Sequence, residues 1–106
     1  MRHMRPMDIF TAISDPVRRD ILAQLRTGEA PAGTLVKALG LPQPNVSKHL
    51  KTLREAGLVR IRADGPTRYY SIDPAPLAAL DQWLDPYRRF WAGRLDALGD
   101  HLGRSD

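Results

Sequence analysis

The stretch LPQPNVSKHLKTLREAG, residues 41–57, decides the fold of this chain. It predicts a helix over Gln43–Arg54 that ends before Gly57, because apolar residues recur on one face at spacings of four and three. Those apolar residues are Val46, Leu50 and Leu53. The rest of the helix surface is polar and cationic, so one face packs on a core and the other is open to a partner.

A shorter helix is expected just before it, over Ala32–Leu39, with Gly40 in the usual position of a left-handed cap. Two short helices joined by a tight glycine-containing turn are typical of a helix-turn-helix, whose second helix enters the DNA major groove. Gln43–Arg54 is therefore the expected recognition helix.

The segment after the recognition helix predicts a β-hairpin over Leu58–Ile72. Leu58–Arg62 alternates apolar and cationic residues over part of its length, and Asp64–Thr67 has the composition of a turn. Arg68–Ile72 is then rich in β-prone residues. A basic hairpin in this place is the wing of a winged helix-turn-helix.

Two helices are expected before the helix-turn-helix. The first is a short apolar segment around Ile9–Ile13. The second begins where Asp15 can cap and Pro16 suits the first helical position, and it stops at Thr27-Gly28.

One long helical segment is expected after the wing. Apolar residues recur at three and four from Pro76 to Leu102, and Pro86 should kink or divide the helix near Leu84-Asp85. The expected fold is mainly α with a small β-hairpin wing, in the order four helices, two strands and one helix. The 106 residues have room for a single domain, 1–106.

The net positive charge of the chain is confined to the segment expected to touch DNA. Six cations and two anions lie between Gln43 and Tyr70, a balance of +4 that equals the net charge of the whole chain. The other 78 residues hold ten charges of each sign. This location favours a nucleic-acid partner more than the sequence pI near 10.0 does by itself.

The polar side chains of the helix and wing have two expected roles. Base edges in the major groove are read by amide–adenine and lysine–guanine pairs, and the residues best placed for this are Gln43, Asn45, Ser47 and Lys48. Phosphates or the minor groove are expected to be held by Lys51, Arg54, Arg60, Arg62 and Arg68.

Three runs of the chain resemble the ArsR-type winged-helix repressors: SDPVRRDIL at 14–22, LPQPNVSKHL at 41–50 and LREAGLV at 53–59. The resemblance implies a homodimer joined by the first and last helices. It also implies two recognition helices in successive major grooves of an inverted-repeat operator, and repression of transcription. The chain departs from the family pattern at Pro42, where serine is usual, and at Pro66, where arginine is usual.

The last helix carries the aromatic residues that the resemblance assigns to a dimer interface. The run from Trp83 to Trp91 resembles a cysteine-free branch of the family, and spacings of four, three and one place its aromatic rings on one side of a helix. We expect 76–102 to be the dimerisation region, with a ligand pocket as the alternative. The expected interface residues are Phe10, Trp83, Tyr87, Phe90, Trp91, Leu95 and Leu98.

Several classes of protein are disfavoured by the sequence. Without cysteine, and with only His101 on the last helix, the chain lacks the ligands through which many ArsR-type proteins sense metals, so no metal or cofactor is expected. His3 and His101 are expected to be exposed, and His49 to pack or contact the DNA backbone. No catalytic constellation is present, so an enzyme is not expected. The lack of a long apolar run or signal core favours a cytoplasmic protein with no membrane partner.

Two alternatives to a sequence-specific repressor of double-stranded DNA remain. One is a winged-helix module that docks a protein through its aromatic stripe. The other is a sequence-tolerant DNA-binding protein, whose affinity falls steeply with salt but changes little with sequence. The sequence points to no particular small-molecule effector.

Overall fold

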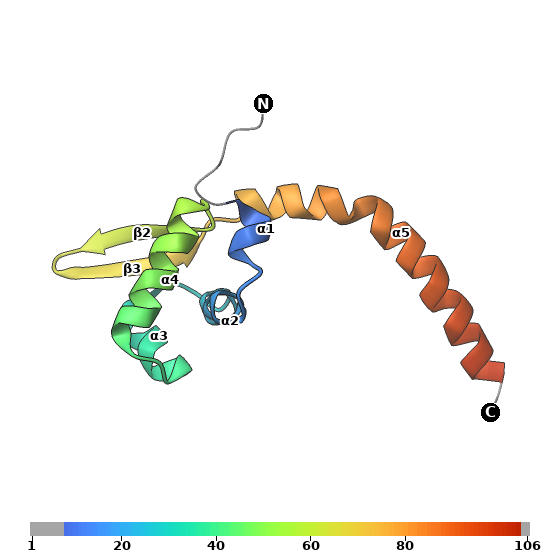
Figure 1. The fold of residues 1–106 in the computed structure, drawn as a ribbon, viewed down its shortest axis with the longest axis horizontal. Helices are drawn as coiled ribbons and strands as arrows, with labels where there is room; N and C mark the ends of the chain where they lie inside the picture. Colours follow the sequence, from blue (N-terminus) through green and yellow to red (C-terminus); the bar gives the residue numbers. More distant parts are fainter. Residues whose placement is uncertain (1–7, 105–106) are drawn as a thin grey trace.

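The computed structural model describes residues 8–104, with side chains as far as residue 99, and arranges them as a winged helix-turn-helix followed by a long helix (Figure 1). The elements are α1 (Ile9–Ala12), α2 (Pro16–Leu25), β1 (Ala30–Pro31), α3 (Ala32–Leu39), α4 (Gln43–Glu55), β2 (Val59–Asp64), β3 (Thr67–Ile72) and α5 (Ala75–Arg104). The predicted fold class is confirmed. In residues 8–104 no helix has an apolar stretch long enough to cross a membrane.

The helices begin and end where local signals predicted. Asp15 Oδ1 accepts hydrogen bonds from the backbone N–H groups of Val17 at 2.8 Å and Arg18 at 3.1 Å, and Pro16 starts α2. Gly40 ends α3 with a φ of 66°, a left-handed conformation that favours glycine. Pro42 precedes α4 without a side-chain cap, as expected from the loss of the family serine.

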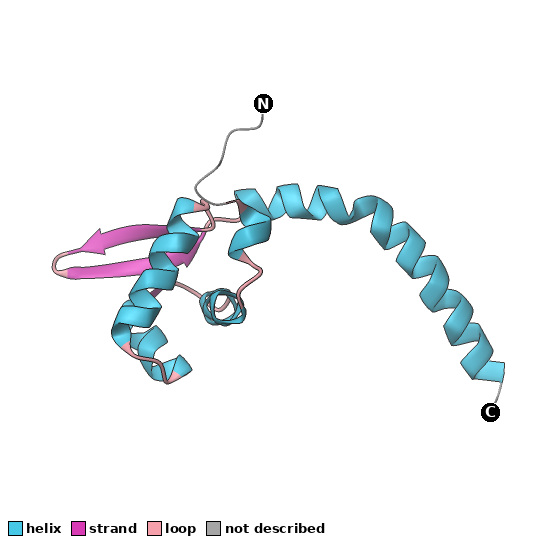
Figure 2. Cartoon of the chain, in the orientation of Figure 1, coloured by secondary structure: helices cyan, strands magenta, loops and turns pink. Residues whose placement is uncertain are grey.

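The wing belongs to a three-stranded antiparallel sheet with the strand order β1-β3-β2 (Figure 2). The sequence predicted β2 and β3 but not β1, in which Ala30 pairs with Tyr70 and Pro31 with Tyr69. A two-residue strand is too short for an alternating pattern. Its proline lacks an N–H, which is tolerated at the edge of a sheet.

The apolar core lies where α2, α3 and α4 meet the base of the wing. Its buried residues are Ile9, Ala12, Ile21, Leu25, Leu35, Val46, Leu50, Leu53, Leu58 and Val59. Burying one aliphatic side chain of this size stabilises a fold by roughly 1.5–3 kcal/mol. The three core residues of α4 therefore fix the orientation of this helix and turn its polar face outward.

α5 is one continuous helix of 30 residues with Pro86 inside it. Of the two expected effects of Pro86, division of the helix does not occur, and α5 instead changes direction along its length, as a kink would produce (Figure 1). A proline removes one backbone hydrogen bond and crowds the preceding turn, which a helix can relieve by bending. The radius of gyration is 18.1 Å, against about 13 Å for a compact domain of this length, because α5 projects away from the core.

Candidate nucleic-acid interface

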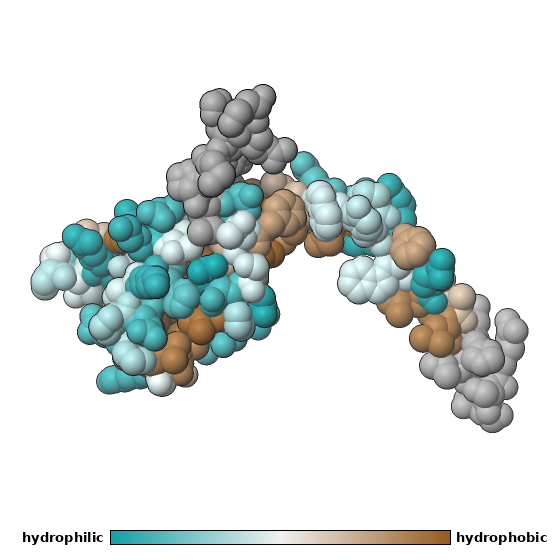
Figure 3. Space-filling view, in the orientation of Figure 1, coloured by the Kyte–Doolittle hydropathy of each residue, from teal (hydrophilic) through white to brown (hydrophobic). Residues whose placement is uncertain are grey.

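The side chains predicted to contact DNA lie on the outer face of α4 and on the wing. All nine are exposed: Gln43, Asn45, Ser47, Lys48, Lys51, Arg54, Arg60, Arg62 and Arg68. Figure 3 shows a mostly hydrophilic surface over this part of the molecule. Their roles in DNA binding stay predictions, but the fold leaves each of these side chains accessible to a nucleic acid.

The side chain of Arg18 in α2 links the end of α1 to α4. Its Nε donates to the carbonyl oxygen of Ala12 at 2.7 Å and its Nη2 to that of Thr11 at 3.2 Å. Its Nη1 lies 3.4 Å from Nδ1 of His49, a half-buried residue of α4. His49 therefore faces α2, in line with the expectation that it packs beside the core. Arg18 was not singled out from the sequence, because its three contacts join segments that only the tertiary fold brings together.

Asp15 is the N-cap residue of α2. Desolvation by itself would raise the pKa of this carboxyl group, but the backbone N–H groups of Arg18 and Val17 outweigh it. The electrostatic interactions with Arg18 and His49 act in the same direction, so the pKa of Asp15 lies below its ordinary value. The ionised carboxylate therefore stabilises the first turn of α2, from which Arg18 reaches α1 and α4.

The arginines of the wing lie on two different faces. Arg60 pairs across the hairpin with Ser71 and Arg62 with Tyr69, whereas Arg68 pairs with Ala63. Cross-strand partners share a face and neighbouring residues alternate, so Arg60 and Arg62 lie on one face and Arg68 on the other. The sequence analysis assigned all three arginines to phosphates or the minor groove, but one flat surface cannot contact both faces of the hairpin.

Arg62 is already engaged by the protein itself. Its Nε lies 3.2 Å from both carboxylate oxygens of Glu29, and its Nη2 lies 2.6 Å from Oε1. The guanidinium also lies 4.7 Å from the centre of the Tyr69 ring and 3.9 Å from Asp64. Hydrogen bonding to Arg62 lowers the pKa of Glu29, and the same bond raises the pKa of Arg62.

We call the ion pair between Arg62 and Glu29 the clamp. It crosses the sheet from β2 over β3 to Glu29, the residue before β1. Glu29 was missed in the sequence, where it lies 33 positions from Arg62 and belongs to no motif. Arg62 brings little uncompensated charge to DNA while Glu29 and Asp64 remain beside it. Of the three wing arginines, Arg60 and Arg68 alone have no ion-pair partner among the described side chains.

The C-terminal half of α4 adds a shallow polar hollow of about 270 Å³ lined by Lys51, Arg54 and Glu55. Neither Lys51 nor Arg54 forms an ion pair within the described part of the chain. Two cations without an ion pair one helical turn apart suit a phosphate backbone, although the carboxylate of Glu55 lines the same hollow.

The predicted dimer residues form an apolar surface that a single chain leaves in solvent. The exposed fractions run from 45% for Phe10 to 63% for Phe90. Within the chain, Phe10 of α1 meets Trp83 of α5 edge to face at 5.4 Å, and Trp83 stacks at a tilt on Tyr87 at 4.8 Å. α1 and the first part of α5 therefore form one surface, but no partner is present and the dimer stays a prediction.

The residues present do not fit a metal centre. Across the described residues, no three His, Cys, Asp or Glu side chains are grouped so that they could hold an ion. His3 and the side chain of His101, which were expected to be exposed, lie outside the described residues.

Comparison with known proteins places the helix-turn-helix and its surroundings among transcriptional regulators. A family model described as a helix-turn-helix domain matches residues 13–62. The HTH-type transcriptional regulator Rv2034 of Mycobacterium tuberculosis is 41% identical over 90 residues, which cover 85% of this chain and 81% of that protein. The transcriptional repressor SdpR of Bacillus subtilis is 34% identical over 77 residues, covering 73% of this chain and 86% of SdpR.

A solved structure agrees over a larger part of the chain. The ArsR-like transcriptional regulator from Rhodococcus sp. RHA1 superposes with a TM-score of 0.71 at 28% sequence identity. The match covers 92% of this chain and 89% of that one. The similarity therefore includes much of α5 as well as the helix-turn-helix and the wing.

Proposed function

The chain belongs to the ArsR family of winged helix-turn-helix transcriptional regulators, and we propose that it is a homodimeric repressor that binds an inverted-repeat operator in double-stranded DNA. The observation that carries this proposal is the exposed polar face of α4, backed by the buried Val46, Leu50 and Leu53. A helix held in this way can enter a major groove about 12 Å wide without losing its own packing.

The dimer is supported by the exposed aromatic surface of α1 and α5. Soluble monomers rarely expose a contiguous apolar patch of this kind, and a second copy would cover it. Two-fold symmetry of the protein would then require two half-sites related by the same symmetry, about 34–36 Å apart or a multiple of that distance. SdpR is named a transcriptional repressor, which favours repression for this chain too, in the cytoplasm at the nucleoid.

Binding to the promoter region upstream of its own gene is the first test. We expect a protected inverted repeat with one protein dimer bound, and an affinity at least 10³-fold above that for unrelated DNA. A folded dimer that binds all sequences equally would instead support sequence-tolerant binding. A folded monomer without salt-dependent DNA affinity would support the protein-interaction module.

Substitutions then separate the two kinds of contact. Gln43→Ala and Ser47→Ala should relax the base preference, since these side chains are placed for base edges. Arg68→Ala should weaken binding to all sequences alike and lower the salt slope by about one, since an exposed arginine would neutralise one phosphate. Arg89→Ala on α5, which removes an arginine paired with Asp85, is the control for the loss of a cation away from the helix-turn-helix and the wing. Equal losses of specificity from Gln43→Ala and Arg68→Ala would contradict this division.

A further inference from the structure

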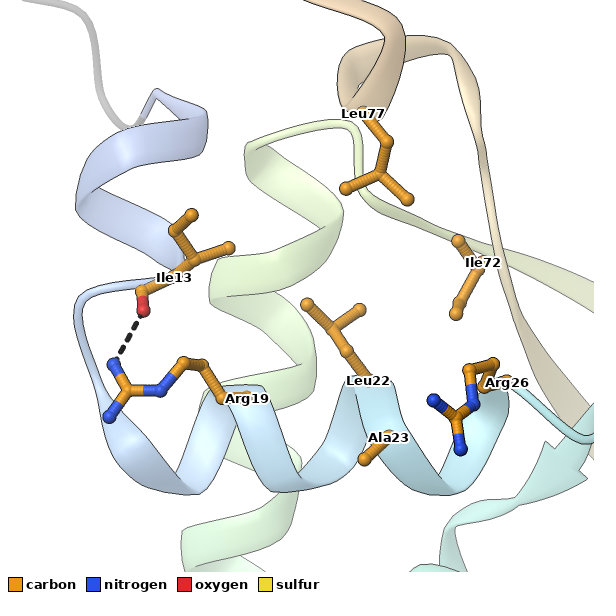
Figure 4. Close-up of a pocket in the computed structure, with 7 residues that line it drawn as sticks. All are labelled: Ile13, Arg19, Leu22, Ala23, Arg26, Ile72 and Leu77. Atoms are coloured by element: carbon orange, nitrogen blue, oxygen red, sulfur yellow. Dashed lines mark hydrogen bonds between the residues drawn. The ribbon is translucent and has the colours of Figure 1, made fainter. Parts of the chain in front are cut away.

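A cavity of about 340 Å³ opens on the side of the molecule formed by α2 (Figure 4). It lies between the end of α1, one face of α2, the end of β3 and the first turn of α5. Its walls are five aliphatic side chains, and two arginines complete the lining: Ile13, Leu22, Ala23, Ile72, Leu77, Arg19 and Arg26. The volume falls at the lower end of the range of small-molecule sites, roughly 300–1,000 Å³.

The two arginines give this apolar cavity a positive border. Arg19 lies in α2 and Arg26 is its C-cap residue with helical dihedral angles, so the two lie seven residues and about 10 Å apart along the helix axis, with the small side chain of Ala23 between them (Figure 4). Arg19 Nη1 donates to the carbonyl oxygen of Ile13 at 2.8 Å. Arg26 has no side-chain hydrogen bond or ion pair among the described side chains, and no carboxylate lines the cavity.

We propose that this cavity binds a small organic monocarboxylate with an apolar body, such as a medium-chain alkanoate, as an effector. The unpaired guanidinium of Arg26 can hold a carboxylate through two parallel hydrogen bonds. The apolar body then lies over Leu22 and Ala23 toward Ile13, against the aliphatic walls of the cavity. An uncharged ligand of the same length would contact the same apolar walls but leave Arg26 without a partner.

The position of the cavity connects the ligand to DNA binding. Ile72 pairs with Val59 at the base of the wing, and Leu77 lies in the first turn of α5. A ligand in contact with both therefore touches the element expected to hold DNA and the helix expected to join two copies. This regulatory role rests on the proposed function, and it requires that the ligand bind the DNA-bound and free forms with different affinities.

The test uses the full chain and three probes that share one apolar tail: decanoate, decanol and decyltrimethylammonium, each below its micelle-forming concentration. Isothermal titration calorimetry should show saturable binding of one decanoate per chain, with about tenfold or more weaker binding of decanol. The cationic probe should not bind. Methyl NMR should place the shifts at Ile13, Leu22, Ile72 and Leu77.

Two variants and two matched controls locate the site. Arg26→Gln should weaken decanoate binding about tenfold or more while leaving that of decanol unchanged, and Arg89→Gln on α5 should change neither. Ala23→Leu should abolish binding of both probes by filling the cavity, and Ala38→Leu on α3 should not. Equal binding of decanoate and decanol, unaffected by Arg26→Gln, would overturn the proposal in favour of simple apolar partitioning.

Operator binding measured in parallel distinguishes the two proposals. Saturating decanoate should change the operator Kd about fivefold or more, the lower end of typical allosteric coupling. Operator binding without decanoate binding would overturn the effector site alone, and decanoate binding without operator binding would overturn the proposed function alone. Decanoate binding without any change in operator Kd would overturn the regulatory role. If decanoate bound only to a monomeric variant, the second copy would be the true occupant of the cavity.

Discussion

The segment from α1 to β3 buries or partly buries most of its large apolar side chains, whereas the helix α5 exposes most of those beyond Leu80. All ten buried core residues lie between Ile9 and Val59, whereas six of the seven exposed large apolar side chains lie on α5 beyond Leu80. Both segments carry the same kind of periodic apolar pattern. A single chain therefore completes the core of the helix-turn-helix but leaves the apolar side of α5 exposed, where the proposed dimer would cover it.

The largest effect is expected where that second surface is missing. Trp91 is 54% exposed in one chain, and Trp91→Ala should shift dimers to monomers at a cost of roughly 3–5 kcal/mol if the ring is buried between copies. Analytical ultracentrifugation measures the dimer dissociation constant. Residues 9–72 should remain folded, because Trp91 is exposed and belongs neither to the buried core nor to the residues packed against it.

Arg89→Ala is the control for Trp91→Ala, since Arg89 lies on the same helix but on the opposite side. It should leave the dimer unchanged. If Trp91→Ala also left the dimer intact, the apolar side of α5 would have another role, and the protein-interaction module would gain support.

A core substitution should act on the other segment. Leu50 of α4 is 1% exposed, and Leu50→Ala should lower the free energy of unfolding by about 2–5 kcal/mol, measured by urea denaturation. Its neighbour Lys51 is exposed, so Lys51→Ala should change stability by less than about 0.5 kcal/mol while weakening DNA binding. Similar losses of stability from the two substitutions would contradict the assignment of the two faces of α4.

The sequence predicted the elements whose signals are local. The predicted bounds of α3 match the structure, and Gly40 has the left-handed conformation that its position indicated. The start of α4 and the cap at Asp15 are also as predicted. In each case one or two residues within a single turn carry the signal, so no tertiary contact is needed to read it.

The features that the sequence did not predict depend on segments far apart in the chain. β1 forms because Ala30 and Pro31 meet β3 about 40 residues later, and the clamp of Glu29 on Arg62 depends on the same meeting. The apolar pattern of α5 was visible, but a pattern looks the same whether its own core or another copy covers it. The structure shows that the core of the same chain does not cover these side chains, because they are exposed.

Removing the N-terminal cap of α2 or of α5 should change the free energy of unfolding by a smaller amount, and the two losses can be compared. Asp15→Ala should lower the free energy of unfolding by roughly 0.5–2 kcal/mol, because two backbone N–H groups of α2 lose their acceptor. Asp73→Ala, at the start of α5, removes one such bond and should cost less. Asp15→Asn keeps an acceptor and should recover part of the loss. Equal losses at Asp15 and Asp73 would show that both caps contribute only local helix stability.

The pH dependence of the Asp15 cap has a definite sign. Because the pKa of Asp15 is lowered in the folded protein, its ionised form stabilises the fold fully above the ordinary carboxyl pKa. That contribution is lost as the pH falls through the lowered value. The stability difference between the wild type and Asp15→Asn should therefore shrink in acid, as thermal unfolding measured at several pH values can show.

The smallest effect is expected at the clamp between Glu29 and Arg62, since both side chains are partly exposed and such pairs are weak. Glu29→Gln should free Arg62 for a phosphate, lowering the operator Kd and steepening the salt slope by about one. Fluorescence anisotropy at several salt concentrations measures both quantities.

Asp96→Asn on α5 is the control for Glu29→Gln, because it removes one negative charge but releases no arginine within the described chain. It should leave the salt slope unchanged, and adding Arg62→Ala to Glu29→Gln should cancel the gain. If Glu29→Gln weakened binding instead, Glu29 would hold Arg62 in the position that DNA requires. The wing would then be preorganised by its clamp, and the folded segment would already be complete for DNA binding while α5 still lacked its partner.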